Sequence, residues 1–297
     1  MQFSVDNVFL SPADSFGRDR MMKLICGKHK DVREVRIANS ILSRPIEGFY
    51  VGSGKRYVLV CAAHHALESI TSNIAYVLLD YLLSKSHSGK ICGVDCKLLL
   101  SKYCFIIVPC VNPDGIELRY HGADSSPLHD RQMKMSGGNF SSWQANARGV
   151  DLNHNYDYRF SEYKLLEKKI GILPGATLYS GEHPESEPEV RGVANLVRTL
   201  LPCTVVSLHS QGEEIYSFPH TPKINRIAKR LADMTGYQSS MPTGTGEYGG
   251  LCDYTSTLGI PSFTFEVGIG KNPLPENCVP DIFSCIGGAL SILPTLL

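Results

Sequence analysis

The chain has 297 residues, and its 29 lysines and arginines balance its 29 aspartates and glutamates. Because the opposite charges cancel, no basic field attracts nucleic acid or an anionic membrane, and we expect neither as a partner. This length suits one large core, so we expect a single domain over residues 1–297, with 1–36 as an N-terminal extension of that domain. The chain begins without a basic segment followed by an apolar one, and no run of about 18 apolar residues is evident, so we expect a cytoplasmic protein.

The first half of the chain contains two apolar runs that predict buried strands. Residues 57–63 (YVLVCAA) predict the first strand, and the chain from 66 to 83 carries apolar residues at helical spacing. Residues 104–110 (CFIIVPC) predict the second strand, which ends in the turn signal VNPDG at 111–115. We expect the polar chain from about 120 to 150 to form a long loop.

The second half of the chain alternates helices and strands. Residues 186–201 (SEPEVRGVANLVRTLL) predict a helix with Ser186 as its N-cap and Glu189 as the capping-box partner. The elements expected after it are a strand at 203–210, a helix at 222–236, a strand at 261–268 and an apolar helix at about 278–294. This alternation predicts an α/β fold, with a twisted, mixed, mostly parallel sheet and helices on both of its faces.

The chain contains ten cysteines, a density far below that of small disulfide-stabilised proteins. Cys61, Cys104 and Cys110 lie inside apolar runs, so we expect buried thiols rather than disulfides. Cys92 and Cys96 have a spacing that suits zinc, but no second pair follows at the distance of a zinc finger. We therefore expect no structural zinc site at these two cysteines.

Three of the predicted strands end in residues that can bind a metal or move a proton. His64, His65 and Glu68 follow the first strand, His209 follows the strand TVVSL, and Glu266 lies within FTFEV. Ligands bind beyond the carboxyl ends of the strands in sheets of this kind. Two histidines and one carboxylate around an open fourth position are typical of a catalytic zinc site, and a further carboxylate can then take a proton from water. A buried charge at Glu266 also needs a partner or a chemical role.

Taken together, these segments resemble the zinc carboxypeptidase family of metallopeptidases. The matching segments occur in family order and are HALE (65–68), VNPDG (111–115), GVDLNHN (149–155), SLHSQGEEIY (207–216), GGLCDY (249–254) and FTFEVGIGKNPLP (263–275). WQANARGVDLN (143–153) and the ending NPLP are most similar to bacterial members that cleave peptidoglycan stem peptides between γ-D-glutamate and diaminopimelate.

The resemblance implies one Zn²⁺ per chain, with His65, Glu68 and His209 as its ligands. It also implies that Glu266 accepts the proton of the attacking water and returns it to the leaving amine. His64 falls on the residue before the family motif, where it could support a ligand or line the pocket. The rival pairing of His64 with Glu68 requires His64 to lie on a helix rather than at the end of a strand.

The chain departs from the family pattern at residues that contact the substrate. Gln144 stands where relatives place the arginine that stabilises the oxyanion, and we expect it to act there as a neutral donor. Asn153 is retained beside His154, which replaces the arginine that clamps a terminal carboxylate. Tyr248 is the candidate for the pocket tyrosine, and Cys252 stands at the position that faces the side-chain pocket.

The expected function is that of a bacterial zinc metallopeptidase that hydrolyses amide bonds of small peptides, including peptidoglycan stem peptides at the γ-D-Glu-diaminopimelate bond. A peptide substrate is the only partner that we expect. Two alternatives stay open. One is a zinc amino-acid deacylase with the same ligands, and the other is a non-catalytic peptide-binding relative, which the changes at Gln144 and His154 favour.

Overall fold

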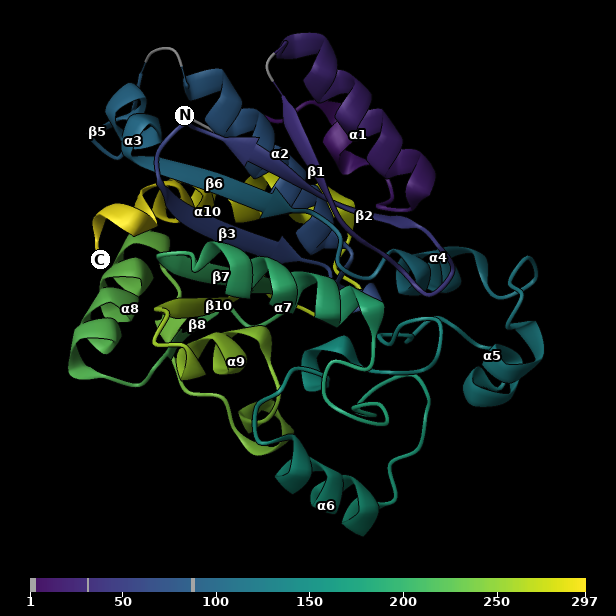
Figure 1. Cartoon of the computed structure of the whole chain (residues 1–297). Coiled ribbons are helices and arrows are strands. Elements are labelled where there is room, and N and C mark those ends of the chain that lie inside the picture. Colours follow the sequence, from purple (N-terminus) through teal and green to yellow (C-terminus); the bar gives the residue numbers. More distant parts are fainter. Residues whose placement is uncertain (1–3, 31, 87–88) are drawn as a thin grey trace.

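The computed structural model describes residues 4–30, 32–86 and 89–297 and shows a large sheet between two layers of helices (Figure 1). The strands of this sheet, in spatial order, are β1 (Arg33–Asn39), β2 (Pro45–Val51), β6 (Tyr103–Val108), β3 (Arg56–Ala62), β7 (Thr204–His209), β10 (Ser262–Glu266), β8 (Glu214–Phe218) and β9 (Gln238–Ser239). Its four central strands, β6, β3, β7 and β10, are parallel to one another. The predicted α/β fold with a mixed sheet is confirmed.

Ten helices connect and cover the strands within the described residues. They are α1 (Ser15–Lys28), α2 (Ile70–Lys85), α3 (Cys96–Lys102), α4 (Pro113–His121), α5 (His129–Ser136), α6 (Phe160–Ile170), α7 (Pro188–Leu200), α8 (Pro222–Thr235), α9 (Leu251–Thr257) and α10 (Val279–Ile292). A small separate sheet joins β4 (Lys90–Ile91) to β5 (Val94–Asp95).

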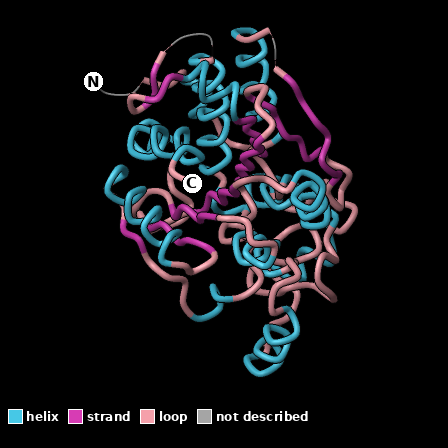
Figure 2. Tube along the Cα trace, turned by 60° about the vertical axis from the view of Figure 1, so that its left-hand side comes forward, coloured by secondary structure: helices cyan, strands magenta, loops and turns pink. Residues whose placement is uncertain are grey.

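The alternation of side chains along the central strands places a core on each face of the sheet. Val58 and Val60 of β3 belong to the larger core, under α1, α2, α8 and α10. Leu59 and Cys61 of the same strand point the other way, into a core under α7 and α9. A turned view shows helices on both sides of the strands (Figure 2). Both faces are buried, which explains why these strands are continuous apolar runs in the sequence.

Several local expectations were wrong. VNPDG is the start of α4 rather than a free turn, with Asn112 as the N-cap and Pro113 as the first helical residue. The expected loop at 120–150 contains α5. The capping box at Ser186 does not form: α7 begins at Pro188, and one oxygen of Glu189 instead accepts a hydrogen bond from the backbone N–H of Ile41.

The N-terminal segment 1–36 was expected to extend the same domain, which stays a prediction, and its residues 1–3 and 31 lie outside the described residues. In the described part, α1 places Met21 and Ile25 in the larger core. All ten cysteines are free thiols, five of them buried.

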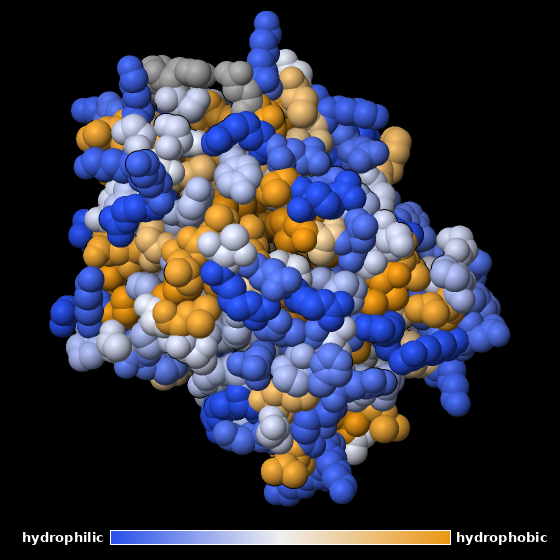
Figure 3. All heavy atoms as spheres, viewed as in Figure 1, coloured by the Kyte–Doolittle hydropathy of each residue, from blue (hydrophilic) through white to orange (hydrophobic). Residues whose placement is uncertain are grey.

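One helical segment near the C-terminus is apolar over about the length that the sequence was expected to lack. Glu276–Thr295, which contains α10, is long and apolar enough to cross a membrane, although 61% of its most apolar window is buried inside the protein. The helix α10 packs against α2 and α8, as the core helix of a globular domain does. On the face shown in Figure 3, hydrophobic residues lie in separate patches among hydrophilic ones.

Candidate metal centre

Three neighbouring strands bring the candidate residues to one edge of the sheet. β3 pairs with β7, β7 pairs with β10, and all three run in the same direction. His209 is the last residue of β7 and lies directly opposite Glu266, the last residue of β10. His65 and Glu68 follow β3 in a short turn and a single 3-10 helical turn, Ala66–Glu68. The predicted residues therefore converge because parallel strands end at a common edge.

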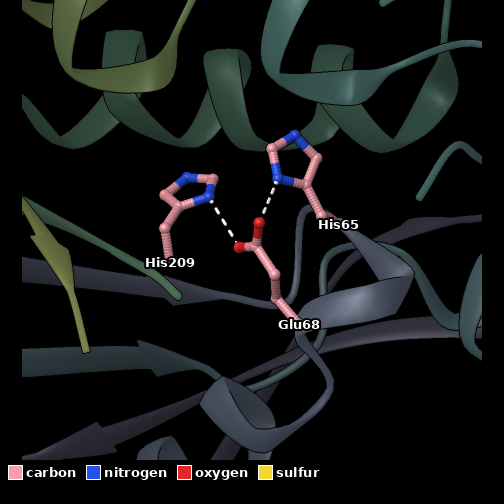
Figure 4. Close-up of side chains that lie close together, drawn as sticks. All are labelled: His65, Glu68 and His209. Atoms are coloured by element: carbon pink, nitrogen blue, oxygen red, sulfur yellow. Dashed lines mark hydrogen bonds and ion pairs between the residues drawn. The ribbon is translucent and has the colours of Figure 1, made fainter. Parts of the chain in front are cut away.

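His65, Glu68 and His209 form a cluster whose candidate ligand atoms all lie within 4.8 Å of one another. The Nδ1 atom of His65 is 2.8 Å from Glu68 Oε1, and the Nδ1 atom of His209 is 3.0 Å from Glu68 Oε2. Both imidazole rings thus face the two oxygens of one carboxylate (Figure 4). The backbone N–H of Ser210 also donates to Glu68 Oε2, at 3.2 Å.

Asp151 holds His65 from the opposite side, a role that no local pattern in the sequence indicates. Its Oδ1 atom lies 3.0 Å from His65 Nε2 and also accepts a hydrogen bond from the backbone N–H of Asn153. Its Oδ2 atom accepts from the backbone N–H of Leu178 and from the hydroxyl of Thr177. A carboxylate on the far nitrogen of a metal-binding histidine fixes the ring orientation and raises the basicity of the ligand.

The charges of the cluster depend on one another. Burial alone would lower the pKa of His65, but the carboxylates of Glu68 and Asp151 outweigh it and raise this pKa well above its ordinary value. Burial opposes ionisation of Glu68, yet His65 and His209 lower the pKa of Glu68 to about 2. Burial also opposes ionisation of Asp151, but the charges of His65 and His154 outweigh it and lower the pKa of Asp151. The cluster is therefore built to keep both carboxylates ionised.

These residues fit a zinc ion. Two imidazole nitrogens and one carboxylate that converge at a single point are the donor set of a catalytic zinc site with an open position. The Nδ1 atoms of both histidines face the carboxylate of Glu68, so the three side chains point their donor atoms at one another. A divalent cation would satisfy the same Nδ1 and carboxylate atoms, and Asp151 would hold the second nitrogen of His65.

Glu266 lies in the wall of a cavity beside the cluster. This cavity has a volume of about 220 Å³, and Asn153, Cys252 and Asp253 also line it. Burial raises the pKa of Glu266 to about 7; His209 opposes this effect and Glu68 reinforces it. The carboxyl group is thus able to exchange a proton near neutral pH.

The residues predicted to contact substrate fall into two groups. Asn153 and Cys252 line the cavity beside Glu266. His154 and Tyr248 are not among the residues that line it: the ring of His154 stacks on Tyr163, with centroids 4.4 Å apart, and its Nδ1 donates to the carbonyl of Tyr248, at 2.9 Å. Their contact with substrate stays a prediction.

Gln144 lies close to the cluster through a chain of hydrogen bonds. Its Oε1 atom lies 3.2 Å from the hydroxyl of Thr177, which lies equally close to Oδ2 of Asp151, the partner of His65, and shares its one proton between these two acceptors. Its backbone carbonyl accepts from the N–H of Ala66, inside the loop that carries His65. This arrangement leaves the side-chain amide of Gln144 as a hydrogen-bond donor near the site.

His64 is fully buried behind the cluster. Its Nε2 atom lies 2.9 Å from the hydroxyl of Tyr156, and its ring stacks on that of His209, with centroids 5.7 Å apart. Burial, reinforced by His209 and His65, lowers the pKa of His64 well below its ordinary value. A neutral ring that faces Tyr156 supports the cluster from behind and lies outside the ligand set.

Comparison with known proteins agrees with this geometry. The zinc carboxypeptidase profile matches residues 19–280. Gamma-D-glutamyl-L-diamino acid endopeptidase 1 of Lysinibacillus sphaericus is 32% identical over 247 residues, which are 80% of this chain and 61% of that protein. Murein peptide amidase A of Escherichia coli (strain K12) is 29% identical over 106 residues, 35% of this chain and 34% of that protein.

A solved structure shows the same fold. Bovine thrombin-activatable fibrinolysis inhibitor superposes with a TM-score of 0.73 at 20% sequence identity, covering 97% of this chain and 98% of that chain. The sheet, the helical layers and the strand ends that carry the cluster therefore belong to a fold that other proteins share.

Proposed function

This chain belongs to the zinc carboxypeptidase family, and from that premise we propose that it is a zinc-dependent peptidase that hydrolyses amide bonds of small peptides. In this proposal His65, Glu68 and His209 hold one Zn²⁺ and Glu266 is the general base. The observation that carries it is the position of Glu266, which lies opposite His209 in the sheet and in the wall of the adjoining cavity.

The roles of the protein groups follow from their positions. When bound, Zn²⁺ polarises the scissile carbonyl and makes a water molecule more acidic. Glu266 accepts the proton of the attacking water and then returns it to the leaving amine, so no covalent intermediate with the protein is needed. The amide of Gln144 donates a hydrogen bond to the developing oxyanion, although a neutral donor binds it less strongly than a charged one.

The substrate that we propose is a peptide derived from peptidoglycan, cleaved between γ-D-glutamate and a diamino acid. The name of the Lysinibacillus relative supports this bond, and the murein peptide amidase supports the class of peptide. The segments WQANARGVDLN and NPLP, typical of such bacterial members, also favour it.

The experiment that tests this function follows cleavage of L-Ala-γ-D-Glu-diaminopimelate by mass spectrometry, with an ordinary C-terminal peptide alongside. The zinc-loaded protein should cleave the γ-glutamyl bond. Glu266→Gln removes the base but keeps the size of the side chain, so we expect kcat to fall by a factor of roughly 100 or more while one zinc stays bound.

Three other outcomes would change the proposal. Full activity of Glu266→Gln would show that Glu266 is not the base. Release of an acyl group from an amino-acid derivative, with both peptides left intact, would establish a zinc deacylase. Binding of the peptide with no turnover by either protein would establish the non-catalytic alternative.

The free cysteine thiols indicate the cellular compartment in which we expect the protein. Ten free cysteines, five of them buried, suit a compartment that keeps thiols reduced, and we infer the cytoplasm of a bacterium, where the protein would act on imported wall peptides. Recovery of the native protein mainly from the extracellular fraction would contradict this inference.

A further inference from the structure

The NPLP segment (272–275) supplies no catalytic residue to the proposed function, yet it belongs to a loop that is bonded to the end of a ligand-bearing strand. The chain after β10 and the chain after β7 are joined through their backbones. The N–H of Val267 donates to the carbonyl of His209, and the N–H of Gly212 donates to the carbonyl of Gly268, both at 2.8 Å. The loop that follows the proposed base therefore holds the loop that follows a proposed metal ligand.

Asn272 adds two side-chain hydrogen bonds to this junction, both to Ser210. Its Nδ2 group donates to the carbonyl of Ser210, at 2.7 Å, and its Oδ1 atom accepts from the hydroxyl of Ser210, at 2.8 Å. Because a carbonyl can only accept, it determines which end of the amide faces it. Ser210 is only 4% exposed. The amide of Asn272, which can both donate and accept, thus holds a buried residue at two points.

Ser210 connects Asn272 to the metal centre. The backbone N–H of Ser210 donates to Oε2 of Glu68, at 3.2 Å, and this is the oxygen that also faces Nδ1 of His209. A turn of Ser210 would carry its N–H away from Glu68. Hydrogen bonds to a ligating carboxylate orient it for the metal, and loss of such a partner typically lowers metal affinity by a factor of about 10 to 100.

We propose that Asn272 is a positioning residue of the metal centre, which holds Ser210 so that its N–H stays directed at Glu68 and thereby strengthens the binding of zinc. The inference rests on the zinc site of the proposed function. It also gives the NPLP segment a physical role in that site.

The test measures the zinc dissociation constant of the folded protein by competition with a chromophoric chelator. Asn272→Ala removes both bonds to Ser210, so we expect the constant to rise by about 10-fold. Asn272→Leu removes the same bonds but keeps a side chain of similar size, and we expect a rise of about the same factor. Agreement between the two variants would attribute the loss to the hydrogen bonds rather than to a cavity.

A matched control separates positioning from general effects on the chain. Asn277→Ala makes the same change at an exposed position shortly after Asn272, and its zinc dissociation constant should stay within about 3-fold of the wild-type value. A purely structural role of Asn272 would lower the free energy of unfolding of the zinc-free protein but leave the zinc affinity of the folded protein unchanged.

The wild-type protein provides a second measurement that requires no variant. By linkage, a contact that strengthens zinc binding must itself become stronger when zinc is bound. Saturation with zinc should therefore slow hydrogen exchange of the Asn272 side-chain amide, followed by NMR, by a factor of at least about 3.

The outcomes distinguish this inference from the function on which it rests. Wild-type zinc affinity in folded Asn272→Ala and Asn272→Leu, an equal loss in Asn277→Ala, or an amide exchange rate that zinc does not change would each overturn the role of Asn272 and leave the proposed peptidase intact. Failure of the wild-type protein to bind zinc would refute the proposed function, and this inference with it.

Discussion

At the residue scale, two adjacent histidines follow the same strand but face different surroundings. His65 lies between two carboxylates, Glu68 on Nδ1 and Asp151 on Nε2. His64 is fully buried and bonds to the hydroxyl of Tyr156. Of these two adjacent rings, that of His65 points at the carboxylate that His209 also faces, so we expect His65 rather than His64 to complete a metal site with His209.

Substitution of the two histidines should therefore have unequal effects on the affinity for zinc. His65→Ala removes a ligand, and we expect the zinc dissociation constant to rise by more than about 100-fold, because loss of an outer partner alone costs 10-fold to 100-fold. His64→Phe keeps a buried ring against His209, and we expect a change below about 10-fold, together with some loss of stability from the unpaired Tyr156 hydroxyl. Competition with a chromophoric chelator measures both constants.

The opposite ranking would identify His64 as the ligand. A large loss in both variants, with both proteins folded by circular dichroism, would show that the two rings act as one unit.

The sequence could predict the cluster because each of its members follows a recognisable strand and because His65 and Glu68 have a diagnostic spacing. Asp151 was missed as a partner of His65: it lies in a loop, 86 residues from that histidine, and no local pattern predicts which ring it contacts. The sequence did not identify Asp253 as a residue of the cavity beside Glu266, for a similar reason. It follows Cys252 directly, and only the fold shows that both line the same cavity.

At the element scale, the start of α4 determines the shape of the loop that carries the site. The Oδ1 atom of Asn112 accepts from the backbone N–H of Gly115 and caps the helix. Its Nδ2 group donates to the carbonyls of His64, Gln144 and Ala145, at 3.0 to 3.1 Å. One buried side chain thus joins the helix start to two loops of the site.

Asn112→Ala should be destabilising for two reasons. It removes an N-cap and also takes this donor away from the buried carbonyls of His64 and Ala145, so we expect the free energy of unfolding to fall by about 2–4 kcal/mol. Thr221→Ala removes the N-cap of α8, where the side chain makes only the capping bond to Ile224, and should cost about 0.5–2 kcal/mol. Urea unfolding of the three proteins gives both differences, and equal losses would mean that the contacts of Asn112 with the loops contribute nothing.

Long apolar elements were predictable, whereas the hairpin β1–β2 and the capping box of α7 were not predicted correctly. The strand β1 lies at the edge of the sheet and is mostly exposed or half-buried, so its sequence lacks a continuous apolar run. The sequence pattern at Ser186 suits a capping box, but Ser186 donates its hydroxyl to Glu187 and Glu189 contacts Ile41. At Ser186 and Glu189, these other contacts outweighed the local sequence pattern.

At the scale of the whole molecule, one buried carboxyl group links stability to pH. Glu189 is fully buried between the start of α7 and the chain at Ile41, and its Oε2 atom has no hydrogen-bond partner. Burial, to which the nearby Glu187 and Asp114 add, raises the pKa of Glu189 to about 8. The folded protein therefore binds a proton here that the unfolded chain releases above its ordinary pKa of 4.5.

Stability should accordingly fall as the pH rises between about 4.5 and 8, because folding takes up this proton, and the contribution of Glu189 should level off above that interval. Glu189→Gln cannot ionise. Relative to the wild type, it should gain stability at up to about 1.4 kcal/mol per pH unit in this range. Urea unfolding of both proteins at about pH 5.5, 6.5 and 7.5 measures the gain, and Asp253, which also titrates, cancels in the difference.

A difference in stability that does not change with pH would show that Glu189 is ionised in the folded protein. Its unpaired oxygen would then have found a partner that satisfies the charge.

The order of the strands also determines when the fold can be completed during synthesis of the chain. β3 lies between β6 and β7, and β7 begins at Thr204, so the centre of the sheet joins segments that are synthesised far apart in time. The larger core is closed by α10, which packs on α2 about 200 residues earlier in the sequence. A growing chain on the ribosome must therefore leave the part of α2 that α10 covers exposed until α10 has emerged, at residue 292. During that interval the exposed apolar surface can associate with other chains, so the yield of native protein depends on how fast synthesis and docking of α10 follow.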